Sequence, residues 1–473
     1  MCAIVGCYNT PAAATITRLG MLNVQHRAQE WVGIVSSDGH NFYPERAPFR
    51  APGHVRQVLT EGVMSTLMGH MAFGHLRYST QGASELNNAQ PHRATTADGD
   101  IFFASNGDIL NCSPLRKELR GRGATFYSAN DAEIIVKLIA HRYRECGDMA
   151  RAIREAKRQL VGTYSGVLMT RDRMFLFRDP IENRPFSYAV APDGAILFAS
   201  ETSAIDIMTA DYPAFEGKRY RRAEVSRDTI LELANGTIIT HEDRQEDRKL
   251  AHCAFEHVYF LRPDSVGFGL LATDTRKRLA TALAKEIDLS ETDFICPVPD
   301  SGNVAALALS RVTGIPMEFA LVRSHYIGRT FIEHTQTARD SAVREKFNPV
   351  SELIRGKVIV LVDDSIVRST TIRQLVGMIR GCEPKKIIVL ITAPPIQHPC
   401  YYGVDIKERL IAADLAGDIE AIKRSIGLRE DEVLHYLSLD GLRSAFPDPQ
   451  NWCYACWNGD YPTSIKDYVR PEG

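Results

Sequence analysis

The chain has 473 residues, more than one hydrophobic core usually supports, so at least two domains are expected. Hydrophobic residues make up 44%, charged residues 24%, and the net charge is −2, which argues against a protein that coats nucleic acid or an anionic membrane. No apolar run is as long as a membrane span, and the N-terminus lacks the basic and long apolar segments of a secretory signal. We therefore expect a cytoplasmic protein without a nucleic-acid or membrane partner.

The first half of the sequence predicts a β-rich unit. Runs of β-branched and aromatic residues alternate with turns rich in Gly, Asp and Asn, and helical patterns lie between them. Two antiparallel sheets with helices outside them fit this order. The expected strands are residues 3–7, 33–36, 71–75, 101–105, 165–169, 173–177 and 196–200, and the expected helices are 15–25, 130–143 and 149–160.

Cys2 is a candidate nucleophile because of its position. Once Met1 is removed, a thiol and a free α-amino group lie on the same residue. The α-amine has a pKa of about 7.7–8.0, so its neutral fraction can act as the base for the thiol. By position alone, an ordinary small residue is the simpler interpretation.

The stretch from 206 to 249 predicts two short strands, at 229–233 and 237–240, followed by a charged run at 241–249. Such a run usually lies in solvent, so we expect it to connect the two halves. Beyond it, helical patterns alternate with buried strands, which is typical of a parallel α/β sheet. The expected strands are 255–260, 293–297, 318–322, 358–362 and 386–392, with helices at 272–286 and 372–380.

Two carboxylates, Asp363 and Asp364, directly follow the apolar strand at 358–362 and precede a hydroxyl-rich loop. In open α/β sheets, ligands bind outside the carboxyl ends of the strands. A loop of hydroxyls and backbone N–H groups at a helix N-terminus suits phosphate, and paired carboxylates suit a ribose or Mg²⁺. The sequence therefore predicts a sugar-phosphate site; an acidic turn capped by Ser365 is the alternative.

The segment DDSIVRSTT, residues 363–371, resembles the phosphoribosyl-pyrophosphate loop of type I phosphoribosyltransferases, and most of all that of the amidophosphoribosyltransferase family. Ser369 stands where the family has glycine. The loop would hold the 5-phosphate, and the two carboxylates would contact ribose hydroxyls or a Mg²⁺ complex. The resemblance implies these contacts with phosphoribosyl pyrophosphate: Asp363, Asp364, Ser365, Arg368, Ser369, Thr370 and Thr371.

Two further segments of the second half resemble parts of the same family. The PDSG segment, residues 299–302, resembles a second active-site loop, which implies that Ser301 lies near Mg²⁺ together with Asp363 and Asp364; a plain turn is the alternative. Residues 323–351 resemble the loop that closes over phosphoribosyl pyrophosphate, which assigns Arg329 to that substrate. Within this segment, Arg323, Ser324 and His325 depart from the family pattern.

The first half, from Cys2 to about residue 206, resembles the glutamine amidotransferase domain of the N-terminal-nucleophile class. The matching motifs are MCAIVG at 1–6, HRAQE at 26–30, GHLRYST at 74–80, NAQP at 88–91, SNGDILN at 105–111 and NDAE at 130–133. Departures from the family pattern are Ala3, Ala28, Trp31, Val32 and Asp108, of which Trp31 has the size to reshape a glutamine pocket.

The resemblance gives each matching residue a role with a physical reason. Cys2 would be the nucleophile, and the Asn106 side chain and Gly107 N–H would stabilise the oxyanion. Arg77 would bind the α-carboxylate of glutamine and Asp131 its α-ammonium. The alternatives are a surface ion pair for Arg77 and a helix N-cap for Asp131.

Ten cysteines in a cytosolic chain indicate metal binding or catalysis rather than a disulfide framework. The CxxC pair Cys453 and Cys456 is by itself compatible with a zinc half-site, a redox pair or neither. Cys253 and Cys400 resemble the remaining ligands of a [4Fe–4S] cluster found in one branch of the family. Four thiolates suit Zn²⁺ or an iron–sulfur cluster; the resemblance favours the cluster, in a structural role.

The resemblance implies an α+β N-terminal-nucleophile glutaminase domain of four αββα layers at 2–245, an α/β type I phosphoribosyltransferase domain at 246–440, and a C-terminal tail at 441–473. The expected activity is transfer of ammonia from glutamine to phosphoribosyl pyrophosphate, giving 5-phosphoribosylamine, glutamate and pyrophosphate, the first committed step of purine synthesis. The family also suggests a homotetramer. A paralogue that uses a different nucleophile and a catalytically silent regulatory homologue are the alternatives.

Overall fold

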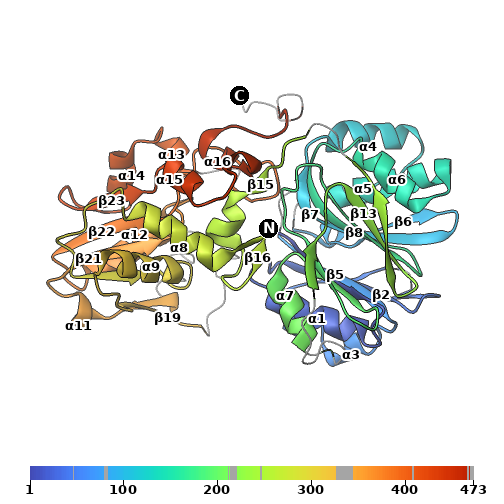
Figure 1. The fold of residues 1–473 in the computed structure, drawn as a ribbon, viewed down its shortest axis with the longest axis horizontal. Helices are drawn as coiled ribbons and strands as arrows, with labels where there is room; N and C mark the ends of the chain where they lie inside the picture. The colour runs from blue at the N-terminus through green and yellow to red at the C-terminus, as the bar shows by residue number, and fades with distance from the viewer. Residues whose placement is uncertain are drawn as a thin grey trace.

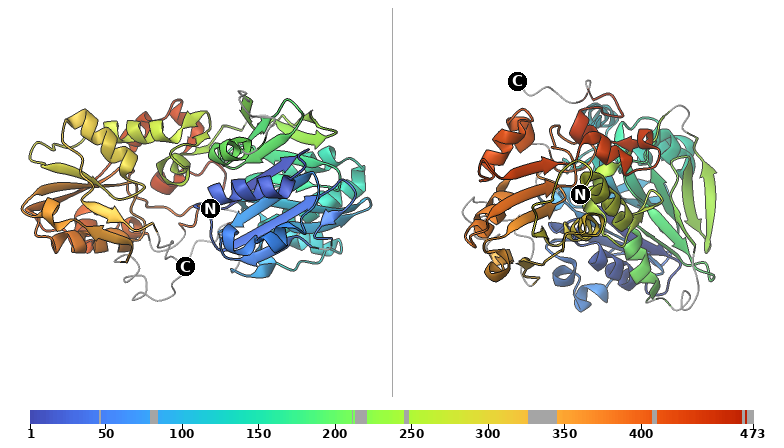
Figure 2. Two further views of the ribbon diagram at one scale, coloured as in Figure 1. Left: turned by 90° about the horizontal axis from the view of Figure 1, so that it is seen from below. Right: turned by 60° about the vertical axis from the view of Figure 1, so that its left-hand side comes forward.

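The computed structural model describes residues 1–45, 47–78, 84–210, 212, 221–244, 248–325, 345–406, 410–465 and 468. They form two lobes, with the first half of the chain in one and the second half in the other (Figure 1). The N-terminus lies at the boundary between the lobes in Figures 1 and 2. No helix in these ranges is both long and apolar enough to cross a membrane.

The first lobe contains two antiparallel sheets. The eight-stranded sheet has the order β12 (Arg221–Glu224), β10 (Ser187–Val190), β11 (Ile196–Ala199), β1 (Ala3–Tyr8), β5 (Met71–Arg77), β2 (Trp31–Ser37) and β3 (Phe42–Tyr43), with β4 (Phe49–Pro52) also paired to β2. The six-stranded sheet has the order β14 (Thr237–Glu242), β13 (Thr229–Ala234), β9 (Met174–Arg178), β8 (Gly162–Met169), β7 (Gly99–Ile109) and β6 (His92–Thr96).

The two sheets pack face to face and helices cover their outer faces, so the layer order is helix, sheet, sheet, helix. Apolar side chains such as Ile4, Phe73, Phe102 and Phe198 are fully buried between the sheets. The eight-stranded sheet packs against α1 (Ala13–Asn23) and α7 (Thr202–Ala210), and the six-stranded sheet packs against α4 (Cys112–Gly121), α5 (Asp131–Cys146) and α6 (Met149–Lys157). The predicted four-layer αββα architecture is confirmed.

The second lobe is built on a parallel sheet with the order β18 (Phe294–Pro297), β21 (Val358–Asp363), β22 (Lys386–Ile391) and β23 (Val433–Tyr436). Side chains of β21 alternate between two buried faces, which explains its continuous apolar run. One face is covered by α8 (Ala272–Leu283) and α9 (Asn303–Thr313), and the other by α12 (Thr370–Arg380) and α14 (Ile419–Ser425).

Shorter elements complete the second lobe and the boundary between the lobes (Figures 1 and 2). β15 (His252–Cys253) pairs in parallel with β24 (Trp452–Cys453), which brings the C-terminal segment to the start of the second half. α15 (Leu439–Ser444) packs against α8. The others there are β16 (Val266–Gly267), β17 (Leu270–Leu271), β19 (Leu321–Arg323), β20 (Phe347–Pro349), α11 (Ser351–Ile354), α13 (Ile411–Asp414) and α16 (Ala455–Asn458). Two further short helices, α2 (Val55–Val58) and α3 (Glu61–Met64), belong to the first lobe and lie near α1.

Three expectations about these elements need correction. The strand expected at 255–260 is wrong, because Glu256–Phe260 forms a helical turn that directs the Glu256 carboxylate to two buried arginines. The strand expected at 318–322 begins at Leu321, and β19 pairs with β20 outside the parallel sheet. The charged run at 241–249 is not all in solvent, since Asp243 is buried in an ion pair with Lys157.

Candidate active sites

Cys2 immediately precedes β1, the strand that pairs with β5, so the fold brings it beside the carboxyl end of β5. Its Sγ is buried and lies 3.6 Å from the carbonyl oxygen of Tyr78. Burial raises the pKa of the Cys2 thiol, and the nearby N-terminal amine and Arg77 act in the opposite direction. Burial also lowers the pKa of the Met1 amine to about 5.

Arg77 and Asp131 are two buried groups of opposite charge near Cys2. Arg77 ends β5 and is only 1% exposed, so it is not a surface ion pair. Asp131 is the first residue of α5, but the helix is capped by Asn130, whose Oδ1 accepts a hydrogen bond from Ala132 N–H. Burial raises the pKa of Asp131 to about 6, and Arg77 partly offsets this effect. Such a pair can bind the two charges of an amino acid.

Asn106 and Gly107 lie next to each other on β7. The Asn106 side chain is buried, and within the described ranges neither its Oδ1 nor its Nδ2 has a hydrogen-bond partner. A buried amide without a partner costs about 1–3 kcal/mol, which a substrate oxygen at Nδ2 would offset in part. Gly107 has φ 156°, and a Cβ there would lie 2.0 Å from the Thr163 carbonyl oxygen, so only glycine fits.

Trp31, the large departure from the family pattern, is the β2 residue directly opposite Arg77. Directly opposite side chains of neighbouring strands point to the same face, so the indole is a neighbour of the Arg77 side chain. Its Nε1 donates to Ser84 Oγ at 3.0 Å, and Ser84 Oγ donates to the Glu30 carboxylate at 3.0 Å. These bonds hold the indole at one wall of the site.

The second candidate site lies at the carboxyl end of β21. Asp363 Oδ1 accepts hydrogen bonds from Ser301 Oγ at 3.1 Å and from the Asp364 N–H at 2.9 Å. The loop carrying Ser301 can approach because Gly302 has no side chain; a Cβ there would be 2.3 Å from the Val362 carbonyl oxygen. Burial, followed by the charge of Asp364, raises the pKa of Asp363 well above its usual range. A cation would favour both ionised carboxylates at this place.

The loop after β21 leads into the N-terminus of α12. Ser365 Oγ donates to Asp364 Oδ1 at 2.6 Å, and Thr370 N–H donates to the Arg368 carbonyl at 2.8 Å. Ser369 precedes the helix with φ 58° and ψ −15°, in the left-handed region. Thr371 is exposed at the start of the helix. The predicted residue Arg329 lies outside the described residues, as do Ser79 and Thr80.

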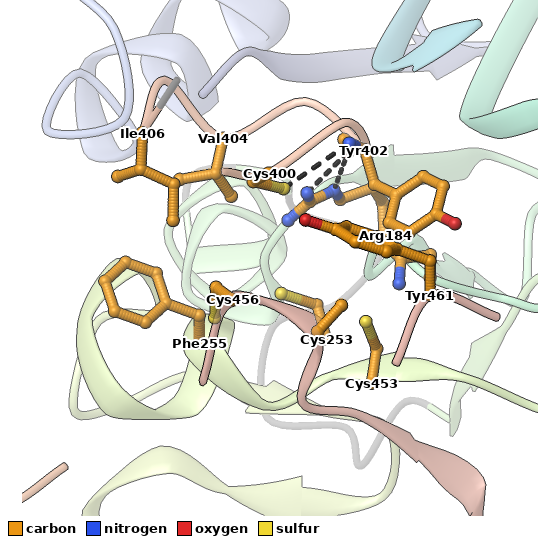
Figure 3. A pocket seen from close by; sticks show the side chains of 12 residues that line it. Arg184, Cys253, Phe255, Cys400, Tyr402, Val404, Ile406, Cys453, Cys456 and Tyr461 are labelled. Carbon is orange, nitrogen blue, oxygen red and sulfur yellow. Dashed lines mark hydrogen bonds between the residues drawn. The ribbon is translucent and has the colours of Figure 1, made fainter. Parts of the chain in front are cut away.

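Four cysteines from three segments line one pocket at the boundary between the lobes (Figure 3). Cys253 and Cys453 are paired in register on β15 and β24, Cys456 follows on α16, and Cys400 comes from the segment after β22. The pocket has an empty volume of about 330 Å³, part of which is open to solvent. Within the described ranges, no three His, Cys, Asp or Glu residues form a group that could hold a metal ion.

Comparisons with known proteins match both halves of the chain. Residues 75–206 match the model of the glutamine amidotransferase domain, and residues 270–410 match that of the phosphoribosyl transferase domain. The chain is 38% identical to the chloroplastic amidophosphoribosyltransferase of Vigna aconitifolia, over 100% of this chain and 92% of that protein. It is 36% identical to the amidophosphoribosyltransferase of Methanocaldococcus jannaschii, over 98% of each chain. The chain belongs to the amidophosphoribosyltransferase family.

Solved structures of such enzymes have the same fold. The glutamine phosphoribosylpyrophosphate amidotransferase of B. subtilis, in complex with ADP and GMP, matches with a TM-score of 0.86 and 33% identity over 99% of both chains. A structure described as the allosteric regulatory enzyme of purine biosynthesis matches with a TM-score of 0.87 and 33% identity over 99% of this chain and 97% of that one. The predicted family, fold class and activity as a glutamine-dependent amidophosphoribosyltransferase are confirmed.

Arg27 and Glu256, to which the sequence assigned no role, connect the first candidate site of this amidophosphoribosyltransferase-family chain to the second lobe. Arg27 Nε donates to the Cys2 carbonyl at 3.0 Å, and its Nη2 donates to Glu256 Oε1 at 2.8 Å. Glu256 is fully buried and also accepts from Arg184. Arg27 lies in the HRAQE motif, so the sequence could have marked it as a site residue. Glu256 lies in the segment 255–260, which was expected to be a strand, and nothing in the sequence marks it.

The left-handed backbone at Ser369 gives a testable consequence for stability. A non-glycine residue at this φ costs about 1–2 kcal/mol, and glycine loses about 0.4–1 kcal/mol through the unfolded chain. We expect Ser369→Gly, the family residue, to raise the free energy of unfolding by roughly 0.5–1 kcal/mol in denaturant titrations. Glu383 has the same φ of 58° on an exposed loop and serves as the matched control as Glu383→Gly. A loss of stability in Ser369→Gly alone would contradict this account.

Proposed function

We propose that the chain releases ammonia from glutamine at Cys2 and transfers it to phosphoribosyl pyrophosphate at the Asp363–Asp364 loop, giving 5-phosphoribosylamine, glutamate and pyrophosphate. The observation that carries this proposal is the set of buried groups around Cys2: a guanidinium, a carboxylate and an amide without a partner in the described ranges. Ammonia passes between the sites inside the protein. The reaction belongs to the start of purine synthesis.

In the glutamine half-reaction, Met1 is removed and the Cys2 α-amine accepts the thiol proton. The thiolate attacks the amide carbon, and the developing oxyanion is bound by Asn106 Nδ2 and the Gly107 N–H. Collapse of this intermediate breaks the C–N bond, releases ammonia and leaves a glutamyl thioester, which water hydrolyses to glutamate. Arg77 holds the α-carboxylate and Asp131 the α-ammonium of the substrate.

The buried Asp131 gives a pH dependence to glutamine binding. Its pKa is about 6 in the folded protein, so below pH 6 it is mostly neutral and binds an ammonium weakly. We expect glutamine affinity to rise about tenfold between pH 5 and pH 7, following the ionised fraction. Calorimetric titration of the Cys2→Ala variant measures binding without turnover. The Asp131→Asn variant should bind weakly with no such rise; an equal rise in that variant would contradict the role of Asp131.

In the second half-reaction, ammonia displaces pyrophosphate from C1 of phosphoribosyl pyrophosphate. The loop from Ser365 to Thr371 holds the 5-phosphate through backbone N–H groups and the hydroxyls of Ser369, Thr370 and Thr371, beside Arg368. Asp363 and Asp364 bind the ribose hydroxyls. The oxygen donors Ser301, Asp363 and Asp364 fit Mg²⁺, which when bound would neutralise charge on the pyrophosphate. Arg329 keeps its proposed role at the same substrate.

The four cysteines fit a [4Fe–4S] cluster, which the resemblance of their flanking segments favours over one zinc ion. Four buried or half-buried thiols line one pocket, and soft thiolate ligands suit the irons of such a cluster. Burial raises the pKa of Cys253 to about 11 and of Cys453 to about 12, and a bound cluster would supply the positive charge that deprotonates them. Cys253, Cys400, Cys453 and Cys456 would hold it, in a structural role.

The cluster proposal predicts the metal content of protein purified without oxygen. We expect about four iron and four sulfide per chain and a visible charge-transfer absorbance. Cys453→Ser should lower the iron content and the thermal midpoint by several degrees, because metal binding contributes to folding. Cys382→Ser, a buried cysteine far from the pocket, is the matched control and should retain the iron. Zinc without sulfide would support the alternative metal.

The division of the chain is also part of the proposal. We place a glutaminase domain at 2–245, a phosphoribosyltransferase domain at 246–440 and a C-terminal tail at 441–473, and the pairing of β24 with β15 supports a tail that braces the second domain. The homotetramer and the cytoplasmic location stay predictions.

One assay tests the proposed function against its alternatives. Protein purified without oxygen receives Mg²⁺, phosphoribosyl pyrophosphate and either glutamine or ammonium chloride, while pyrophosphate and glutamate are measured. We expect pyrophosphate with either donor and glutamate with glutamine. Pyrophosphate release that needs a different nucleophile would support a paralogue, and no turnover would support a silent homologue.

A further inference from the structure

We propose that the segment Cys400–Gly403 of the second lobe is a positioning element for the glutamine half-reaction, because it supports the backbone of Gly107 from behind. This inference rests on the proposed role of Gly107 in the oxyanion site. It extends that role by naming what holds the glycine in place: a segment almost 300 residues away that also carries one of the four pocket cysteines.

The contact between the two glycines is direct. Gly403 has φ 99°, and a Cβ placed on it would lie 3.0 Å from the carbonyl carbon of Gly107 and 3.1 Å from its Cα and oxygen. That separation is tighter than nine in ten contacts of real Cβ atoms, so a side chain at position 403 would require the Gly107 backbone to give by a few tenths of an ångström. A shift of Gly403 toward Gly107 would therefore move the proposed oxyanion donor.

Hydrogen bonds fix the same segment to the strand that pairs with β7. The carbonyl oxygen of Tyr402 accepts from Thr163 Oγ1 at 2.9 Å, and Thr163 lies on β8, opposite Asp108 in register. Arg184 Nε donates to the same oxygen at 2.9 Å (Figure 3). The Arg184 carbonyl in turn accepts from Ser165 Oγ at 3.1 Å, and Ser165 is the register partner of Asn106. The Tyr402 carbonyl of the second lobe is thus connected to β8 directly through Thr163 and indirectly through Arg184 and Ser165. Both β8 residues lie beside the Asn106–Gly107 segment of β7.

A second connection reaches Cys2. Arg184 Nη1 lies 3.3 Å from Glu256 Oε1, which accepts from Arg27, and Arg27 Nε donates to the Cys2 carbonyl. Arg27, Arg184 and Glu256 are all buried, so solvent does not weaken this chain of charge-assisted bonds. Hydrogen bonds through Arg184 therefore connect the Cys400–Gly403 segment to Cys2 as well as to the oxyanion donors.

Cys400, one of the four pocket cysteines, makes hydrogen bonds at the other end of the segment. Cys400 Sγ accepts from the Tyr402 N–H at 3.4 Å (Figure 3), and the Cys400 N–H donates to the Ile406 carbonyl at 3.2 Å. A group bound by the four thiols would hold Cys400, and with it Tyr402 and Gly403. A change in the position of Cys400 in the thiol pocket would then also change the position of Gly403 against the oxyanion site.

The first test is Gly403→Ala, which places a methyl group against the Gly107 backbone. We expect kcat with glutamine to fall about ten- to a hundredfold, while KM for glutamine stays within about threefold because Arg77 and Asp131 are untouched. The rate with ammonium chloride should stay within about twofold. Gly427→Ala is the control: Gly427 has φ 85° and open space around it, so it tests the backbone strain alone and should change neither rate.

A milder variant covers the case in which Gly403→Ala does not fold. Thr163→Val keeps the shape and removes only the hydrogen bond to the Tyr402 carbonyl, and we expect a three- to tenfold loss of kcat with glutamine at unchanged KM. Thr17→Val removes an equally buried hydroxyl, which donates to the Ala72 carbonyl and also lies 3.6 Å from Cys7 Sγ, and should leave kcat unchanged. Hydrogen exchange of β7 amides should be faster in Thr163→Val than in Thr17→Val.

The inference is overturned if folded Gly403→Ala, or Thr163→Val, keeps the kcat of the unmodified chain with glutamine, or loses glutamine and ammonia rates equally. A different result addresses the proposed function: if Asn106→Ala also keeps full kcat with glutamine, the assigned oxyanion site is wrong. The two failures are thereby separated.

Discussion

The Cys2→Ala variant should lose glutamine-dependent pyrophosphate release by at least about a thousandfold and keep the ammonia-dependent rate within about twofold. The reason is that the thiol is the only group proposed to attack glutamine, whereas added ammonia enters the reaction after that step. Parallel assays of pyrophosphate with each nitrogen donor measure both rates in the same preparation.

The control for this variant is Cys146→Ser, a change at a half-buried cysteine at the end of α5, far from Cys2 in sequence and without a proposed role. It should leave both rates unchanged. Loss of the ammonia-dependent rate in Cys2→Ala, with the fold intact by circular dichroism, would contradict the division of the two half-reactions between the two domains.

Replacement of the paired carboxylates Asp363 and Asp364 should slow the second half-reaction and leave the glutamine half-reaction intact. Asp363→Asn or Asp364→Asn removes a negative charge where the ribose and the Mg²⁺ complex are proposed to bind. We expect pyrophosphate release to fall about a hundred- to a thousandfold with either nitrogen donor, a size typical for loss of one electrostatic contact to a transition state. Glutamine hydrolysis without phosphoribosyl pyrophosphate should change by less than about twofold.

Asp414→Asn, a change of an exposed carboxylate in the same domain, is the matched control and should not alter either rate. If the Asp363 and Asp364 variants lose only the glutamine-dependent rate, the second site lies elsewhere. Because Asp363 has its pKa raised in the absence of a cation, its asparagine variant is not expected to reduce stability.

Elements with strong local patterns could be predicted from the sequence. The apolar run at 358–362 became β21 and the helical pattern at 130–143 became the first part of α5. The run at 255–260 is rich in aromatic residues but also contains Glu256 and His257, and such a short run does not distinguish a strand from a helical turn. Buried bonds from Arg27 and Arg184 to Glu256 decide its conformation, and these partners are distant in sequence.

The site was predictable where motifs carry the chemistry and not where packing does. Cys2, Arg77, Asn106 and Asp131 each lie in a motif, and the fold brings them to one end of the first lobe. The support of Gly107 by Gly403 has no sequence signal, because it depends on how two lobes meet. The conformation of Ser369 was also open, since the family glycine suggests a positive φ whereas serine favours a negative one, and the structure shows φ 58°.

The central claim is that one chain joins the two sites and passes ammonia between them internally. The most direct measurement supplies glutamine with ¹⁵N in its amide together with an excess of unlabelled ammonium chloride, and then traps the phosphoribosylamine for mass spectrometry. The account predicts that product formed by the unmodified chain is mostly ¹⁵N-labelled, and that product formed by Cys2→Ala is unlabelled. Label diluted to the isotope ratio of the bulk ammonium would contradict it.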